Sequence, residues 1–142
     1  MKRPKIEIIG TRAVVSNIDK TNKRGREGAE EGLIAGGYLV MNDAKYLTPV
    51  DTGRLRASES VNWTGSGMNR GKYKPVKGSK PTDPVGRPRG MKDFVVVVGT
   101  NVEYGEHVHK RVPYLKAALY QNKKKIEMVL ANAIKQKLKG AF

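Results

Sequence analysis

Histidine is the residue type in this chain best suited to metal binding or acid–base chemistry, and it occurs as His107 and His109. On a strand, alternate side chains point to the same face, so the two imidazoles could face one way as metal ligands do. The chain has no cysteine, and the nearby carboxylates, Glu103 and Glu106, are scattered. We therefore interpret the pair as surface histidines and expect neither a metal site nor a cofactor.

The other candidate motifs for chemistry are incomplete. Gly65, Gly67 and Gly71 miss the dinucleotide-binding fingerprint by one residue, and no βαβ pattern surrounds them. Gly71 and Lys72 lack the earlier glycine and the following Ser or Thr of a phosphate-binding loop. No set of Ser, His and acid is arranged so that it singles itself out. The sequence therefore predicts a protein that is not an enzyme.

An aromatic residue between cations, Tyr73 between Lys72 and Lys74, could stack on a base while the lysines contact phosphate. No recognised nucleic-acid-binding signature accompanies it. The competing interpretation is a flexible basic arm that orders only against a partner. We favour the arm, because glycine and proline are dense in residues 65–92 and suit wrapping better than a fixed groove.

The formal charge of +15 is unevenly distributed. Residues 1–26 carry a net charge of +6, residues 64–92 carry +7 and residues 110–142 carry +8. Residues 27–63 and 93–109 each carry −3. This segregation indicates a protein that docks on an acidic surface, either nucleic acid or protein. Lysine that merely keeps the protein soluble is the simpler alternative.

Length and composition predict one domain over residues 1–142. No stretch approaches the roughly 18 apolar residues of a membrane span, so we expect no contact with a membrane. The start of the chain is basic but lacks the apolar region of a signal peptide. The absence of cysteine excludes disulfides and favours a cytosolic origin.

Hydrophobic periodicity predicts the elements that must position these groups. Strands are expected at residues 5–9, 59–64 and 94–100, helices at 27–47 and 113–139, and a brief helix from Thr11. Val95 to Val98 show no alternation, so the strand that contains them should be central and buried on both faces. The predicted fold class is α+β, a small antiparallel sheet packed against a long central helix and a C-terminal amphipathic helix. The long basic loop 65–92 should join two antiparallel strands.

The predicted helix 27–47 has an unusually wide apolar face. One stripe contains Ala29, Leu33, Gly37, Val40, Ala44 and Leu47, and Ile34, Tyr38 and Met41 form a second beside it. Such a helix should be covered on two sides, by its own sheet and by a neighbouring subunit. Gly32, Gly36 and Gly37 disfavour helix, which is tolerable where another backbone packs closely. Glu27, Glu30 and Glu31 are expected in the first turn, where the helix dipole favours negative charge.

The segment from Thr48 to Ser58, which we call the corner, separates this helix from the sheet. Pro49 removes a backbone donor and should stop the helix. Asp51 or Thr52 should cap a short helical turn, with Gly53 easing the tight backbone and Leu55 pointing inward. The corner motif thus comprises Pro49, Asp51, Thr52, Gly53, Leu55 and Arg56.

The corner closely resembles a family signature, P-V-D-T-G-x-L-R-x-S, of the small tail-completion and neck proteins of long-tailed bacteriophages. This family is typified by the tenth gene product of a lambda-like phage. Residues 98–105 (V-G-T-N-V-E-Y-G) resemble the family's V-G-T-x-x-x-Y-A strand end, and residues 112–119 (V-P-Y-L-K-A-A-L) resemble its P-F-L-R-P-A-L entry into the last helix. The chain departs from the family at 106–111, and Lys116 and Ala117 replace the usual arginine and proline.

The resemblance implies a structural virion protein that forms a homo-oligomeric ring, expected to be a hexamer, at the head–tail junction. Assembly would take place in the cytoplasm of the bacterial host, and the mature location would be the neck or tail of the virion. Its partners would be connector, tail terminator or tail tube proteins, with non-specific contact to DNA in the channel. Candidate subunit or partner contacts are Arg54, Arg70, Lys72, Tyr73, Lys74, Lys77, Lys80, Arg87, Arg89, Tyr104 and Tyr114.

Two alternatives stay open. One is a basic nucleic-acid-binding protein, and the other is the tail terminator that caps the tail tube. The sequence also leaves open whether Arg54 and Arg56 pair with the subunit's own carboxylates or reach across to the next subunit.

Overall fold

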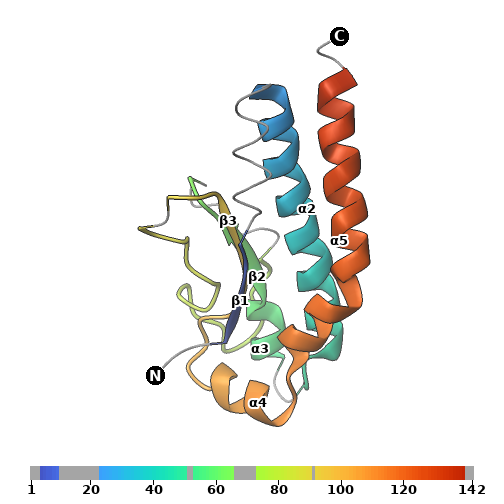
Figure 1. Cartoon of the computed structure of the whole chain (residues 1–142). Coiled ribbons are helices and arrows are strands. Elements are labelled where there is room, and N and C mark those ends of the chain that lie inside the picture. The colour runs from blue at the N-terminus through green and yellow to red at the C-terminus, as the bar shows by residue number, and fades with distance from the viewer. Residues whose placement is uncertain (1–3, 10–22, 51–52, 66–72, 91, 140–142) are drawn as a thin grey trace.

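The computed structural model describes residues 4–9, 23–50, 53–65, 73–90 and 92–139. It confirms the α+β class (Figure 1). The elements are β1 (Lys5–Ile9), α2 (Lys23–Leu47), α3 (Arg54–Ser58), β2 (Ser60–Trp63), β3 (Val95–Gly99), α4 (Gly105–Arg111) and α5 (Tyr114–Lys139). The brief helix predicted from Thr11 lies outside the described residues.

The sheet has the order β1-β3-β2, and β3 pairs antiparallel with both neighbours. The central position predicted for Val95 to Val98 is confirmed, since all four are at most 1% exposed. Val96 and Val98 belong to the main core with Val61 and with Leu33 of α2. Val95 and Val97 point to the other face, where their apolar surface needs a separate cover.

That cover comes from the segment between β2 and β3. Val85 is 5% exposed and packs with Val95 and Val97. Pro84 forms a bridge with Thr100, and the Val85 amide donates to the Ser60 hydroxyl. The described end of the predicted arm 65–92 is therefore part of the fold. The arm interpretation is wrong for Asp83 to Val85, because apolar burial on the second sheet face outweighs the flexibility of the surrounding glycine and proline.

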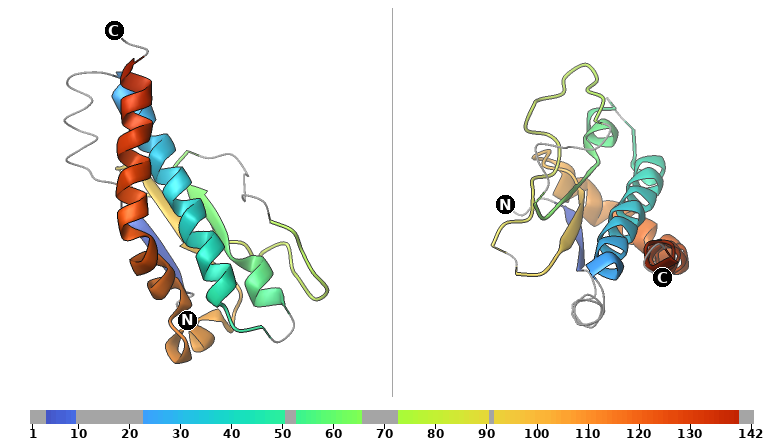
Figure 2. Two further views of the ribbon diagram at one scale, coloured as in Figure 1. Left: turned by 90° about the vertical axis from the view of Figure 1, so that its right-hand side faces the viewer. Right: turned by 90° about the horizontal axis from the view of Figure 1, so that it is seen from above.

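The two long helices pack side by side and antiparallel (Figures 1 and 2). Gly28, Gly32 and Gly36 of α2 face α5, and a Cβ built on Gly32 would lie 2.8 Å from the Cα of Leu130. Gly37 instead faces the sheet, where its Cβ would lie 2.7 Å from Val96. The glycines thus let α5 and the sheet approach two sides of α2, as their helix-disfavouring cost suggested. The second side is covered by the subunit's own α5.

Two details of α2 differ from the sequence prediction. The helix begins at Lys23, so its first turn contains no acidic residue and the placement of Glu27, Glu30 and Glu31 in that turn is wrong. Gly25 and Gly28 have low helix propensity, which disfavours a helix that begins before Glu27, yet both are buried in α2. The helix ends at Leu47, just before Pro49, as predicted.

The corner turns at Gly53, which occupies the N-cap position of α3 with φ 83° in the left-handed region. The predicted cap by Asp51 or Thr52 falls on residues outside the described part. Glycine adopts positive φ at little cost, so Gly53 can make the turn alone. Leu55 points inward as predicted and is 5% exposed.

Candidate functional site

The three segments that carry the family resemblance meet in the structure at the end of the molecule where α3, α4 and the start of α5 lie (Figure 1). Arg54 bonds Glu103, Ser58 bonds Thr100, and Glu59 lies beside Tyr114. We call this meeting place the junction. It brings residues distant in the chain into direct contact, so each segment fixes the position of the others.

Arg54 is the centre of the junction. Its Nε and Nη2 donate to the two carboxylate oxygens of Asp83 at 2.9 and 2.8 Å. Its Nη1 and Nη2 donate to the two oxygens of Glu103 at 3.1 Å each. The Arg54 side chain is 12% exposed and that of Asp83 2%, whereas Glu103 is 54% exposed. The planar guanidinium suits two bidentate partners, and the buried one matters more for stability.

The hydrogen bonds and charges in this network shift the pKa values of its members. Hydrogen bonds to Asp83 and Glu103 raise the pKa of Arg54. Burial pushes the pKa of Asp83 upward, but the hydrogen bonds from Arg54 and the Lys80 amide outweigh it, so that pKa lies below its ordinary value. The hydrogen bond from Arg54 lowers the pKa of Glu103 to about 2. The network is therefore fully ionised at neutral pH.

Further contacts enclose Arg54. The Tyr104 ring lies 5.6 Å from its guanidinium carbon, within the range of a cation–π contact. The Lys80 ammonium lies 3.7 Å from Glu103, and both are exposed. The Asn101 amide donates to the Asp83 carbonyl at 2.7 Å. Arg54 thus links the corner to the segment after β2 and to the chain after β3.

Both arginines of the corner make hydrogen bonds within the subunit. Arg54 pairs with the subunit's own carboxylates, whereas Arg56 is exposed and donates to the Thr48 carbonyl at 3.2 Å. Contact of either arginine with a neighbouring subunit stays a prediction. Tyr114 is 1% exposed and part of the core, so it is wrong as a candidate subunit contact.

A second part of the junction is a buried hydroxyl pair. Ser58 and Thr100 contact each other through their hydroxyls at 2.5 Å, and both are at most 1% exposed. The Ser58 hydroxyl also lies 2.6 Å from the Leu55 carbonyl, and Thr100 Oγ1 accepts from the Val102 amide. These bonds tie the end of α3 to the end of β3.

Glu59 is a buried carboxyl at the end of α3. Within the described part of the chain, its two oxygens and the Tyr114 hydroxyl are buried without a hydrogen bond of acceptable geometry. Burial raises the pKa of Glu59 to about 8, although the nearby Tyr114 hydroxyl and the charge of Lys45 oppose the shift. Burial beside Glu59 also raises the pKa of Tyr114. The carboxyl is thus mainly protonated at neutral pH.

The two histidines do not form a ligand pair. They lie on α4, so the strand geometry considered for them is wrong, and residues two apart on a helix point in different directions. His109 packs its ring against Tyr114 at 5.2 Å, and burial lowers its pKa. Among the described residues no group of three or more His, Asp or Glu could hold a metal ion.

The remaining candidate contacts lie on the basic segment before β3. Lys74, Lys77, Lys80, Arg87 and Arg89 are exposed, and Tyr73 is half-buried with its hydroxyl 3.3 Å from the Lys80 carbonyl. Tyr104 is 37% exposed. Arg70 and Lys72 lie outside the described residues. Because Lys72 is not described, the stacking role of Tyr73 between two lysines stays a prediction.

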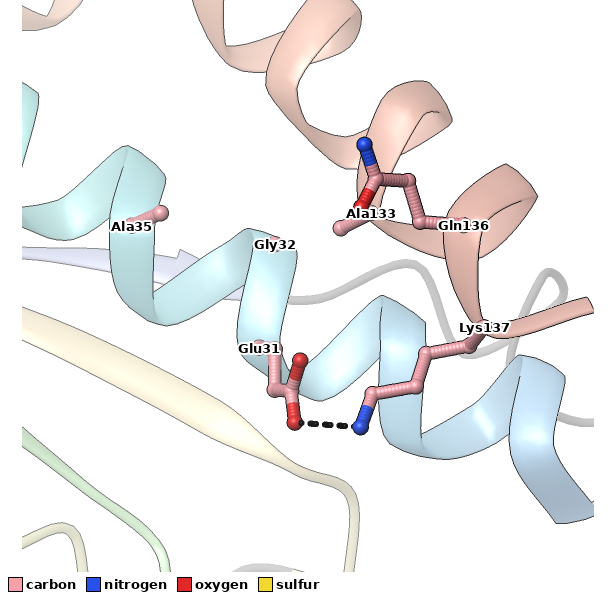
Figure 3. Close-up of a pocket in the computed structure, with 6 residues that line it drawn as sticks. All are labelled: Glu31, Gly32, Ala35, Ala133, Gln136 and Lys137. Atoms are coloured by element: carbon pink, nitrogen blue, oxygen red, sulfur yellow. Dashed lines mark ion pairs between the residues drawn. The ribbon is translucent and has the colours of Figure 1, made fainter. Parts of the chain in front are cut away.

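A shallow hollow lies between α2 and α5, with a volume of about 500 Å³ (Figure 3). Gly32, Ala35 and Ala133 form its small-residue wall, and an ion pair of 3.1 Å joins Glu31 to Lys137 at its end. It contains no nucleophile or buried acid. We assign it no catalytic role.

Sequence reasoning missed the partners of Arg54. One signal was present, because Asp83 is the single acid in the otherwise basic residues 64–92.

None of the described helices is long and apolar enough to cross a membrane. No protein-family model, curated protein or solved structure matches the chain.

Proposed function

We propose that this chain is a structural subunit of a tailed bacteriophage virion, in a ring at the head–tail junction or the top of the tail, where it takes part in head–tail joining. One observation carries the proposal. The three segments that resemble the tail-completion and neck family converge on the junction, where Arg54 and Ser58 bond the second segment and Leu55 shares one buried core with Tyr114 of the third. Rigid internal contacts of this kind support an architectural role for those motifs.

A ring subunit needs two complementary surfaces, because a heterologous interface closes only through rotation. Tyr46 is 84% exposed, and Val50, Val112 and Tyr104 are 54%, 43% and 37% exposed. These side chains belong to the end of α2, the corner and the two ends of α4, and those segments lie together at the lower end of Figure 1. Exposed apolar groups at one end favour contact with another protein there.

The exposed lysines of residues 73–80 supply a second candidate surface. Lys77 lies within a tight turn, and Lys74 precedes it. In this turn the Val76 amide donates to the Ser79 hydroxyl and the Ser79 amide donates to the Val76 carbonyl. The turn projects from a base that Asp83 and Val85 hold on the sheet. A basic projection on a fixed base suits docking on an acidic face of a connector or tail protein.

Disrupting the gene in the phage that encodes it tests the proposal. Electron microscopy of the lysate should show filled heads and complete tails that are not joined. Tails of irregular length would instead favour the tail terminator, and normal infectious particles would overturn both assignments.

A basic nucleic-acid-binding protein is the second candidate, favoured by the exposed lysines of α5. Such a protein would act free in the cell. Its absence from purified particles, together with tight duplex binding at low salt, would favour this candidate over the ring.

A further inference from the structure

The last helix has one strongly basic side. The segment α5 contains seven lysines, no arginine and a single acid, Glu127. Ile126, Leu130 and Ala133 face α2, where they contact Gly36, Gly32 and Gly28. Lys124, Lys135 and Lys139 recur at helical spacings on the opposite side and are exposed. We call these three the outer lysines.

Within the described part of the chain, the outer lysines form no ion pair. Of the α5 lysines, Lys137 pairs with Glu31 and Lys116 lies over the Tyr120 ring at 5.9 Å. No described carboxylate lies within ion-pair distance of the outer lysines. Lys135 and Lys139 lie four residues apart on the helix, where like charges repel each other slightly unless a partner neutralises them.

We propose that the outer side of α5 is a binding surface for the phosphate backbone of duplex DNA. The cores of protein–protein interfaces are depleted in lysine, and among the described residues the outer side offers only Tyr120 and Met128 as large exposed apolar groups. Lysine is a compact point charge on a flexible stem, which suits phosphate contacts that do not depend on sequence. An acidic protein partner is therefore the weaker match.

The dimensions fit this partner. The outer lysines span about 22 Å from Lys124 to Lys139, at about 1.5 Å per residue. One turn of duplex DNA spans about 34–36 Å, so all three lysines can lie against a single turn. In Figures 1 and 2, α5 lies on the side of α2 away from β2 and β3, so its outer side is not covered by a described element. The inference deepens the proposed function and rests on it for the source of the duplex, which would be the genome that passes through the ring.

The test compares full-length variants for binding to a random-sequence duplex over a range of salt. The variant Lys124→Gln/Lys135→Gln/Lys139→Gln removes the outer lysines, and glutamine has a similar helix propensity. Each lost phosphate contact reduces the slope of log K against log salt by about 0.9. Loss of three contacts therefore changes the slope by about 2.7. Between 50 and 200 mM salt, the affinity of the unmodified protein should fall about 40-fold more than that of the variant.

The matched control, Lys92→Gln/Lys110→Gln/Arg111→Gln, removes the same charge from exposed positions outside α5. It should keep the slope of the unmodified protein, and neither variant should have a lower melting temperature. Equal losses of slope in the two variants would overturn the inference, since net charge alone would then explain binding. Equal affinity for poly-glutamate and duplex at the same salt would also overturn it, in favour of an acidic protein.

These results are separable from the proposed function. A protein found in the neck whose outer lysines do not affect duplex binding refutes the DNA surface and leaves the ring. A protein absent from particles refutes the ring, whatever the slopes are.

Discussion

Replacing Arg54 with alanine should destabilise the subunit strongly, because it leaves Asp83 buried without its partner. The Asp83 side chain is 2% exposed and accepts two hydrogen bonds from Arg54. Breaking a buried ion pair on one side typically costs about 3–5 kcal/mol. Asp83 keeps the hydrogen bond from the Lys80 amide, so we expect about 3 kcal/mol. The measurement is equilibrium unfolding in urea.

The matched control is Glu103→Gln, which weakens the exposed half of the same network. Glu103 is 54% exposed, and exposed pairs contribute little to stability. A double-mutant cycle should therefore give a large coupling energy for Arg54 with Asp83 and a small one for Arg54 with Glu103. An Arg54→Ala variant that loses less than about 1 kcal/mol, or equal coupling to both acids, would refute the reasoning.

The same network predicts sensitivity to acid. The pKa of Asp83 lies below its ordinary value, and that of Glu103 is about 2. A carboxyl with a lowered folded-state pKa stabilises the protein above its unfolded-state pKa of about 4 and loses that effect as the pH falls further. Stability should drop below about pH 4 in the unmodified protein and less steeply in Arg54→Ala.

Three further variants test other parts of the structure. Gly32→Ala should cost about 1–2 kcal/mol in urea unfolding, because overpacking against the Leu130 backbone exceeds the gain in helix propensity, while the control Gly86→Ala, which meets nothing within 4 Å, should be neutral; a neutral Gly32→Ala would contradict the close packing. The raised pKa of Glu59, about 8, means that the folded state holds a proton which the unfolded chain has released, so stability should fall as the pH rises from about 5 to 8. Thermal melts of Glu59→Gln should lack this decrease, and an unchanged pH dependence would show that another group causes it. Lys74→Glu/Lys77→Glu should leave unfolding within about 0.5 kcal/mol, because both residues are exposed, and should prevent particle assembly in a complementation assay; assembled particles would contradict the docking role.

Much of the fold could be predicted from periodicity, because its main elements bury regular apolar faces. Val95 to Val98 indicated a central strand by the absence of alternation, and that strand is central. The spacing of Leu33, Val40 and Ala44 indicated the core face of α2, and all three are buried. These signals are local, so a single sequence suffices to see them.

The errors arose where tertiary contacts override local preference. Gly25 and Gly28 disfavour helix, but burial lets α2 start at Lys23. Residues 105–111 contain the two histidines and become a helix whose only buried residue is Gly105, with Thr100 2.9 Å from where its Cβ would lie. Neither outcome follows from propensity.

The site was predictable only in part. The resemblance singled out three segments, and Arg54 was among the named residues, yet its partners Asp83 and Glu103 are 29 and 49 residues away in sequence. Pairing at such separation depends on sheet register, which the sequence does not display. Val85 is one of the few apolar residues of its loop, and nothing in its sequence context indicates that it covers the second face of the sheet.

The central claim is that this chain is a ring subunit of a tailed virion. Cryo-electron microscopy of the particles whose genome encodes it tests that claim most directly. The account predicts a closed ring between head and tail whose subunit density fits α2, α5 and the three-stranded sheet. Complete particles without that density, and without the protein in their composition, would contradict it.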